Sequence, residues 1–276
     1  MSSINSISAE KLARLVGTPK CPVLVDVCSE EDFAAAPRLI PGAVRRSYAH
    51  TADWAGEFSG RSVIVICQKG LKLSQGVAAW LRHDGAAADI LDGGIEGWSK
   101  AGLPVIPAEK LPPRDPQGRT VWVTRARPKI DRIACPWLIR RFVDPNAAFL
   151  FVAPSEVAGV VEKFGATPFD VDGVFWSHRG EFCTFDIMVE EFGLATEPLM
   201  RLATIVRGAD TARLDLAPEA PGLLAASLGL SRMFADDLRQ LEAGMLLYDA
   251  FYRWCRDAVE ETHDWTSHAP RSKGGR

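Results

Sequence analysis

The sequence predicts an α/β protein in which a parallel sheet with flanking helices is followed by a second, mixed and mostly helical α+β domain. Three observations lead to this prediction. Strands alternate with helices up to residue 107, a polar, proline-rich segment without periodicity follows at 108–118, and helical periodicity dominates the last third. Strands that alternate with helices are typical of a parallel sheet. A length of 276 residues also suggests about two domains.

The elements of the first half follow from local patterns. Ser8 and Ser74 are predicted helix N-caps, and Pro41-Gly42 predicts a turn. The run of β-branched residues at 63–66 predicts a strand buried on both faces. In order, we expect a helix at 9–16, a strand at 23–27, a helix at 30–36, an extended segment at 39–44, a strand at 63–66, a helix at 74–83, a strand and turn at 88–94 and a helix at 95–102.

A cysteine, Cys67, follows this buried strand, and a short loop with Lys69, Gly70 and Lys72 leads into the next helix. Strand, loop and helix should place the sulfur beside backbone N–H groups and a positive helix end. We therefore expect the thiolate form of Cys67 to be stabilised, and the same N–H groups are suited to an anion such as a sulfur oxyanion. The alternative interpretation is a buried structural cysteine.

Residues 5–107 resemble a single rhodanese domain. The resemblance rests on Leu24-Val25-Asp26-Val27, on Ile40-Pro41-Gly42-Ala43, on the Cys67 loop and on residues 91–104. It implies a sulfurtransferase in which Cys67 is the nucleophile and carries sulfane sulfur as a persulfide. The substrate would be a small sulfur-containing anion or a thiol, and sulfur transfer would require no cofactor. The substrate-binding residues would be Gln68, Lys69, Gly70, Leu71 and Lys72 of the loop, with Asp26 at the neighbouring strand end.

Some positions depart from the family pattern. Cys28 replaces the arginine that often follows Asp-Val, which removes a cation near the site. Lys72 replaces an arginine five positions after the cysteine, so the charge is kept but the planar fork is lost. Leu73 lies where the related phosphatases carry arginine, which disfavours phosphatase activity. Two functions therefore stay open: a sulfurtransferase, or a non-catalytic sensor of redox state, oxyanions or metal.

The second half repeats the strand and helix patterns. Pro136 fits the first turn of a helix, so a helix is predicted to begin beside Cys135, whose thiolate would be stabilised there. The basic residues Arg125, Arg127, Lys129 and Arg132 form either a solvated face or an anion site. The expected elements are a strand at 120–124, a helix at 137–143, a strand at 148–152, a helix at 156–164, extended segments at 169–171 and 173–178, a helix from 184, and helices over 197–260 with breaks at Gly208 and 218–222.

Several candidate metal ligands gather in this half. Zinc and iron bind histidine, cysteine and carboxylate side chains, but the spacing here matches no standard metal motif. A hydrogen-bonded core histidine, an exposed glutamate and packed thiols would explain the same residues. A zinc, iron or anion site is therefore a hypothesis. Its candidate residues are Asp131, Cys135, His178, Glu181, Cys183 and Asp186.

Residues 120–258 resemble the C-terminal domain of the ChrB family of chromate-resistance regulators. The resemblance rests on residues 132–145, 175–186 and 247–252. It implies a role in resistance to chromate or oxidative stress. The ChrB family carries a different N-terminal region, to which regulation is attributed, so DNA binding is not expected here. Cys135 and Cys183 are candidate sulfur acceptors.

Composition and length complete the prediction. The net charge of −3 gives no reason to expect a nucleic acid partner. No apolar run approaches the roughly 20 residues of a membrane span, and the first residues do not resemble a signal peptide. We therefore expect a cytoplasmic protein whose six scattered cysteines are reduced. The oligomeric state stays open.

The predicted parts are a rhodanese-like domain at 1–107, a linker at 108–118, a ChrB C-terminal-like domain at 119–261 and a polar tail at 262–276.

Overall fold

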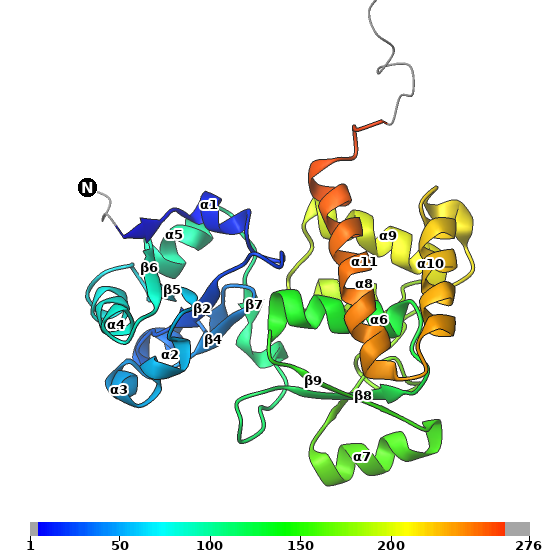
Figure 1. Cartoon of the computed structure of the whole chain (residues 1–276), viewed down its shortest axis with the longest axis horizontal. Coiled ribbons are helices and arrows are strands. Elements are labelled where there is room, and N and C mark those ends of the chain that lie inside the picture. Colours follow the sequence, from blue (N-terminus) through cyan, green and yellow to red (C-terminus); the bar gives the residue numbers. More distant parts are fainter. Residues whose placement is uncertain (1–4, 263–276) are drawn as a thin grey trace, which may run out of the picture.

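The computed structural model describes residues 5–262, so nearly all of the predicted polar tail lies outside the described residues. Figure 1 shows two lobes side by side, with the sheet of the first half on the left and the helices of the second half on the right. This arrangement confirms the predicted fold class. Between residues 5 and 262, every helix is too short or too polar to cross a bilayer.

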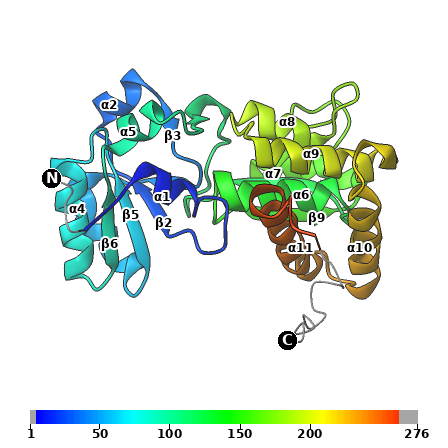
Figure 2. The same ribbon diagram turned by 90° about the horizontal axis from the view of Figure 1, so that it is seen from above.

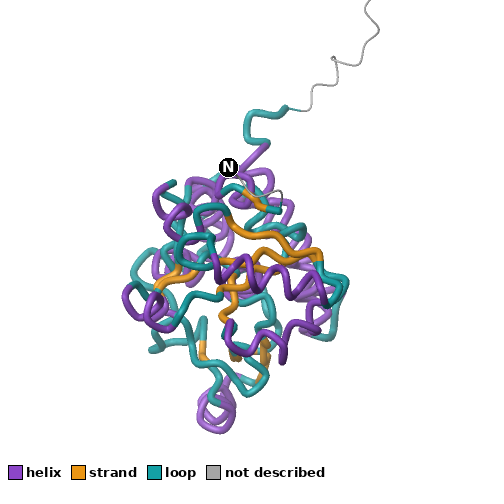
Figure 3. The backbone as a smooth tube through the Cα atoms, turned by 90° about the vertical axis from the view of Figure 1, so that its left-hand side faces the viewer, coloured by secondary structure: helices purple, strands orange, loops and turns teal. Residues whose placement is uncertain are grey.

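The first domain is built on a five-stranded parallel sheet in the order β1-β6-β5-β2-β4. Its strands are β1 (Ser6–Ile7), β2 (Val23–Asp26), β4 (Ala43–Arg45), β5 (Ser62–Ile66) and β6 (Ala87–Leu91). Its helices are α1 (Ala9–Ala13), α2 (Glu30–Ala35), α3 (Thr51–Trp54), α4 (Lys72–His83) and α5 (Gly94–Lys100). A separate antiparallel pair joins β3 (Arg38–Leu39) to β7 (Ile106–Pro107). The strands are orange in Figure 3, where the first domain faces the viewer.

Alternate residues of β5 serve two different cores. Val63 and Val65 pack with residues of α4, whereas Ile64 and Ile66 pack with residues of α1 and α5. Helices cover both faces of the sheet, which explains why this strand is apolar throughout. Figures 1 and 2 both place α4 on the side of the first domain that is farthest from the second domain.

The second domain contains a three-stranded parallel sheet in the order β10-β8-β9. The strands are β8 (Val121–Arg125), β9 (Ala148–Val152) and β10 (Thr167–Pro168). The helices are α6 (Asp131–Leu138), α7 (Val157–Phe164), α8 (Thr184–Glu191), α9 (Glu197–Asp210), α10 (Ala220–Met233) and α11 (Asp237–Asp257). Val123 of β8 packs against α7, and Trp122 packs into the main core, which includes α6 and α8.

Several predicted helix boundaries are wrong. The α6 helix begins at Asp131 and contains Pro136 in its interior, so Cys135 does not lie at a helix start. The α4 helix begins two residues before Ser74, which is therefore not its N-cap. Gly208 does not break α9. A Cβ atom there would lie only 3.0 Å from the Cβ of Ala220, so this glycine permits close packing between helices.

The two domains share one apolar core, in which residues of α1 and α5 join those of α6, α9 and α11. The Phe142 ring fills the space where a Cβ atom of Gly17 would be, 2.1 Å from its nearest carbon. The predicted linker also docks on the second domain: Lys110 pairs with Glu191 at 2.6 Å and Arg114 with Asp144 at 3.2 Å. The segment at 108–118 is thus part of the packed structure.

Candidate functional site

Cys67 lies at the carboxyl end of β5, as predicted, and is 4% exposed. Its thiol donates to the hydroxyl oxygen of Ser74 at 3.3 Å. The Ser74 hydroxyl in turn donates to the carbonyl oxygen of Leu71 at 3.1 Å. Ser74 therefore orients the sulfur from the first turn of α4.

The loop after Cys67 turns its carbonyl groups toward α5. The amides of Ile95 and Glu96 donate to the carbonyls of Cys67 and Gln68 at 3.0 and 3.1 Å. In a trans peptide the next N–H points the opposite way, so the amides of residues 68 and 69 face away from α5. Among the described residues, the amides of 68–71 find no acceptor. The amides of residues 68 and 69 are the candidates for anion binding, whereas the Gly70 nitrogen lies against Gly94 of α5.

The side chains of the loop differ in their accessibility. Lys69, Leu71 and Lys72 are exposed, whereas the Gln68 amide donates to the Glu96 carboxylate at 3.2 Å. A cavity of about 330 Å³ lies between α4 and the segment at 48–52, and Lys72, the first residue of α4, is among the residues that line it. Cys67 does not line this cavity and packs with the apolar cluster that includes Val65 and Val77.

Asp26 does not lie where a substrate could reach it, although its position at a strand end made it a candidate. It is 1% exposed. Its carboxylate accepts from the backbone N–H of Cys28 at 3.1 Å and pairs with Arg45 at 3.3 Å. Burial raises the pKa of Asp26, and burial together with the Asp26 charge raises the pKa of the Cys28 thiol. Asp26 and Cys28 are thus structural partners.

Arg45 replaces the cation that the sequence lacks after Val27. It pairs with Glu30 at 2.6 Å as well as with Asp26, and its guanidinium lies 3.8 Å from the centre of the Phe33 ring. Arg45 was not predicted as this partner, because it lies far from Asp26 along the chain. Only the pairing of β2 with β4 brings the two together.

We expect Arg45→Met to destabilise the protein by about 2–3 kcal/mol, because it leaves the buried Asp26 carboxylate without its cation. Arg46→Met is the matched control: Arg46 pairs with Glu57, which is 56% exposed, so the loss should stay below about 1 kcal/mol. Urea denaturation measures both. The double variant Asp26→Asn/Arg45→Met should recover part of the lost stability. Equal losses in the two arginine variants would contradict this role of Arg45.

A second cluster of titratable side chains lies in the second domain. The Nε2 atom of His178 lies 3.4 Å from Asp131, 3.3 Å from Asp170 and 3.4 Å from Asp210, in each case measured to one carboxylate oxygen. Hydrogen bonds with Asp131 and Asp170 raise the pKa of His178 to about 10. Burial and the charges of Asp131 and Asp170 raise the pKa of Asp210 to about 7.

Of the predicted metal ligands, the structure brings His178 to Asp131, and the Cys135 thiol lies 3.9 Å from the other Asp131 oxygen. Glu181 is exposed and pairs with Arg213, and Asp186 pairs with Arg207 at 2.9 Å. Cys135 and Cys183 are fully buried, and burial raises the pKa of both thiols well above the ordinary value. Their thiolates are therefore not stabilised, contrary to the expectation for Cys135. Asp170 and Asp210 were missed, since nothing in their local sequence marks them.

The basic residues after β8 are mostly engaged in internal contacts. Arg125 and Arg132 pair with Asp170 at 3.3 and 3.2 Å. Arg127 donates to the carbonyl of Ser231 near the end of α10 at 2.6 Å and to that of Phe234, which follows α10, at 3.1 Å. These contacts hold the second domain together and explain most of the basic run without an anion.

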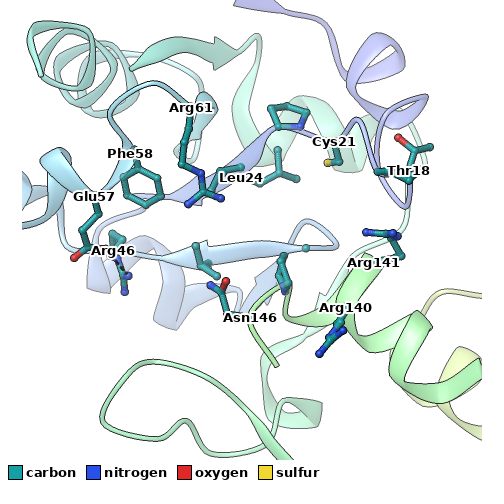
Figure 4. A pocket seen from close by; sticks show the side chains of 16 residues that line it. Thr18, Cys21, Leu24, Arg46, Glu57, Phe58, Arg61, Arg140, Arg141 and Asn146 are labelled. Atoms are coloured by element: carbon teal, nitrogen blue, oxygen red, sulfur yellow. Dashed lines mark hydrogen bonds and ion pairs between the residues drawn. The ribbon is translucent and has the colours of Figure 1, made fainter. Parts of the chain in front are cut away.

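A further cavity of about 180 Å³ lies at the junction of the two domains (Figure 4). Arginines from both domains line it: Arg46, Arg61, Arg140 and Arg141. Arg140 and Arg141 already pair with carboxylates of α11. Cys67 does not line this cavity, so it is separate from the sulfur site.

Comparisons with known proteins match both halves of the chain. Residues 8–101 match the model of the rhodanese-like domain, and residues 122–255 match that of the ChrB C-terminal domain. Protein ChrB of Cupriavidus metallidurans is 35% identical over 181 residues, which cover 62% of this chain and 50% of that protein. The chain thus spans about half the length of this curated relative.

Solved structures similar to this chain include rhodanese-like proteins. A rhodanese-related protein of Thermoplasma volcanium is 22% identical. The match covers 37% of this chain and 97% of that protein, with a TM-score of 0.32. A rhodanese-like domain protein of Staphylococcus aureus is 25% identical and covers 34% of this chain and 91% of its own, with a TM-score of 0.31. A thiosulfate sulfurtransferase of Pseudomonas aeruginosa is 24% identical. The match covers 38% of this chain and 20% of that protein, with a TM-score of 0.32. The two family models thus identify a rhodanese-like domain within residues 8–101 and a ChrB C-terminal domain within residues 122–255.

Proposed function

We propose that the protein is a sulfurtransferase that carries sulfane sulfur as a persulfide on Cys67. The observation that carries this proposal is the loop of amides at 68–71, which begins at the cysteine and has no acceptor among the described residues. Such a ring of N–H groups stabilises an anionic sulfur. The rhodanese-like match supports the same chemistry.

The transfer proceeds in two balanced steps. The Cys67 thiolate attacks the outer sulfur of thiosulfate, a new S–S bond forms, and the bond to the sulfonate breaks with release of sulfite. A thiolate or cyanide then attacks the terminal sulfur of the persulfide, which gives a new persulfide or thiocyanate and restores the Cys67 thiolate. The loop amides stabilise the negative charge in both steps, and no cofactor is required.

The exposed lysines of the loop give the site its preference for anions. Lys69 and Lys72 are the cations of the loop, and both reach solvent. Lysine holds an oxyanion as a point charge and without the bidentate fork of arginine. We therefore propose a small sulfur oxyanion or a thiol persulfide as the donor, with weak ground-state binding.

The biological setting that we propose is resistance to chromate or oxidative stress, in the cytoplasm. It rests on the likeness of residues 122–255 to the ChrB C-terminal domain. Since the relative named Protein ChrB is matched over half of its length, its activity is not transferred as a whole. A regulatory protein without turnover is the second candidate function. The observation that favours it is Lys72, which replaces the arginine of active rhodaneses.

Cys67→Ser tests the sulfurtransferase. The wild type should form thiocyanate from thiosulfate and cyanide, and mass spectrometry should find one added sulfur atom on the Cys67 peptide. The variant should lose both, because serine does not form a persulfide. Cys21→Ser is the matched control: Cys21 is half-buried at the domain junction, so turnover should not change. Equal turnover in the wild type and Cys67→Ser would exclude the proposal. If the wild type shows neither turnover nor an added sulfur atom, the sulfurtransferase is excluded and the regulatory protein is the remaining candidate function.

A further inference from the structure

We propose that Asp131, Asp170 and His178, with Asp210 beside them, bind one divalent transition-metal cation, and that this cation is zinc. The site lies in the second domain and uses none of the residues of the Cys67 loop. Whether this site binds a metal therefore does not depend on whether Cys67 transfers sulfur.

The ligand atoms converge from separate elements. Asp131 begins α6, Asp170 follows β10, His178 precedes α8 and Asp210 ends α9. One ligand atom from each of Asp131, Asp170 and His178 lies within 4.8 Å of the others. Both aspartates are buried, whereas the imidazole is 39% exposed, so a cation can enter from solvent.

The distances around His178 fit a shared metal ion better than a hydrogen-bond network. Its Nε2 atom lies 3.3–3.4 Å from three carboxylate oxygens. That nitrogen carries at most one hydrogen, so it cannot donate well to all three. Ligands arranged tetrahedrally at about 2.0–2.1 Å from zinc are about 3.3–3.4 Å from one another. The three separations measured from Nε2 have the size expected between neighbouring ligands of one ion.

Hydrogen bonds from outside the cluster hold the carboxylates in place. The Thr184 amide donates to Asp131 at 2.7 Å, and the Thr184 hydroxyl donates to Asp170 at 3.0 Å. Arg132 pairs with Asp170 at 3.2 Å. Partners of this kind orient metal ligands and raise metal affinity.

A buried hydroxyl group without a partner, on the strand beside the segment that leads to Asp170, is a second observation. Thr124 is 0% exposed, and its hydroxyl has no partner among residues 5–262. Side chains alternate along β8, so Thr124 shares the side of Trp122, which faces α6. Thr124 lies beside Phe169, the residue before Asp170, because the Phe169 amide bonds to the neighbouring Val123 carbonyl. A buried donor without a partner at this place points to a missing ligand, such as a water molecule on the metal.

The donor atoms select the class of cation. One imidazole nitrogen and carboxylate oxygens suit zinc, manganese or ferrous iron, and not the soft cuprous ion. The buried thiols of Cys135 and Cys183 lie outside the group of converging ligand atoms. Zinc is chosen because the three separations from the imidazole nitrogen match those between ligands of a tetrahedral zinc ion.

Zinc titration of the full chain tests the site. The protein carries Cys67→Ser in every sample, so that zinc does not bind this thiol, and is first treated with a chelator. Calorimetry should find one zinc per chain. His178→Asn and Asp210→Asn should each weaken binding by at least the ~10–100-fold that loss of an outer partner causes. His50→Asn is the matched control, since His50 forms an exposed pair with Asp53 and should leave affinity unchanged.

Cobalt(II) gives a second measurement that does not depend on activity. Cobalt at this site should show visible absorption of a tetrahedral complex without a sulfur-to-cobalt band, and His178→Asn should abolish it. Circular dichroism of the metal-free variants confirms that they are folded. No zinc uptake by the parent protein, full affinity in a folded His178→Asn variant, or a cobalt spectrum with thiolate ligation would each overturn the proposal.

Discussion

Gly94→Ala is expected to destabilise the protein by about 2–4 kcal/mol and to disrupt the Cys67 loop. Gly94 has a positive φ of +58°, and a Cβ atom there would lie 2.2 Å from the carbonyl oxygen of Cys67 and 2.6 Å from the amide nitrogen of Gly70. A left-handed conformation costs a residue other than glycine about 1–2 kcal/mol, and overpacking costs about 1–3 kcal/mol. The methyl group must push the loop away from α5, which shifts the amides that follow Cys67.

Gly102→Ala is the matched control for this prediction. Gly102 has a similar φ of +68° but no atom within 4 Å of an added Cβ, so only the backbone cost applies. Urea denaturation gives both stabilities, and alkylation of Cys67 by iodoacetamide reports the loop without requiring turnover. Only Gly94→Ala should change the alkylation rate by more than about tenfold, which corresponds to 1.4 kcal/mol. The same change in both variants would show that α5 does not shape the loop.

Asp249→Ala is expected to cost about 3–5 kcal/mol of stability. The Asp249 carboxylate on α11 is 7% exposed and accepts from the indole of Trp137 at 2.8 Å and from Arg141 at 2.8 and 2.7 Å. Its removal leaves a buried N–H group and a partly buried cation without an acceptor. The packing of α11 on α6 then loses its polar link.

The control for Asp249 lies two turns earlier on the same helix. Glu242 pairs with Arg140 but is 64% exposed, so Glu242→Ala should cost less than about 1 kcal/mol. The urea midpoint should fall strongly in Asp249→Ala and only slightly in Glu242→Ala, with similar slopes. Comparable midpoints in the two variants would show that burial adds nothing to the Asp249 network.

The sequence predicted the parts of the structure that depend on neighbours along the chain. The apolar run at 63–66 and the cysteine after it define a strand and a loop through local periodicity alone. Asp170 and Asp210 could not be found in this way, because only tertiary packing brings the segment after β10 and the end of α9 to His178. Pro136 misled the prediction, since tertiary contacts hold α6 together around it.

The shared core at the domain junction limits how freely the halves can be exchanged. A rhodanese-like domain is a transferable module only where its surface is polar. Here Phe142 fills the space above Gly17, so a donor domain with any larger residue there would collide with the ring. Either half alone would expose apolar side chains of the junction to solvent. Substitutions on the two sides of the junction are therefore expected to be tolerated during evolution only in compatible combinations.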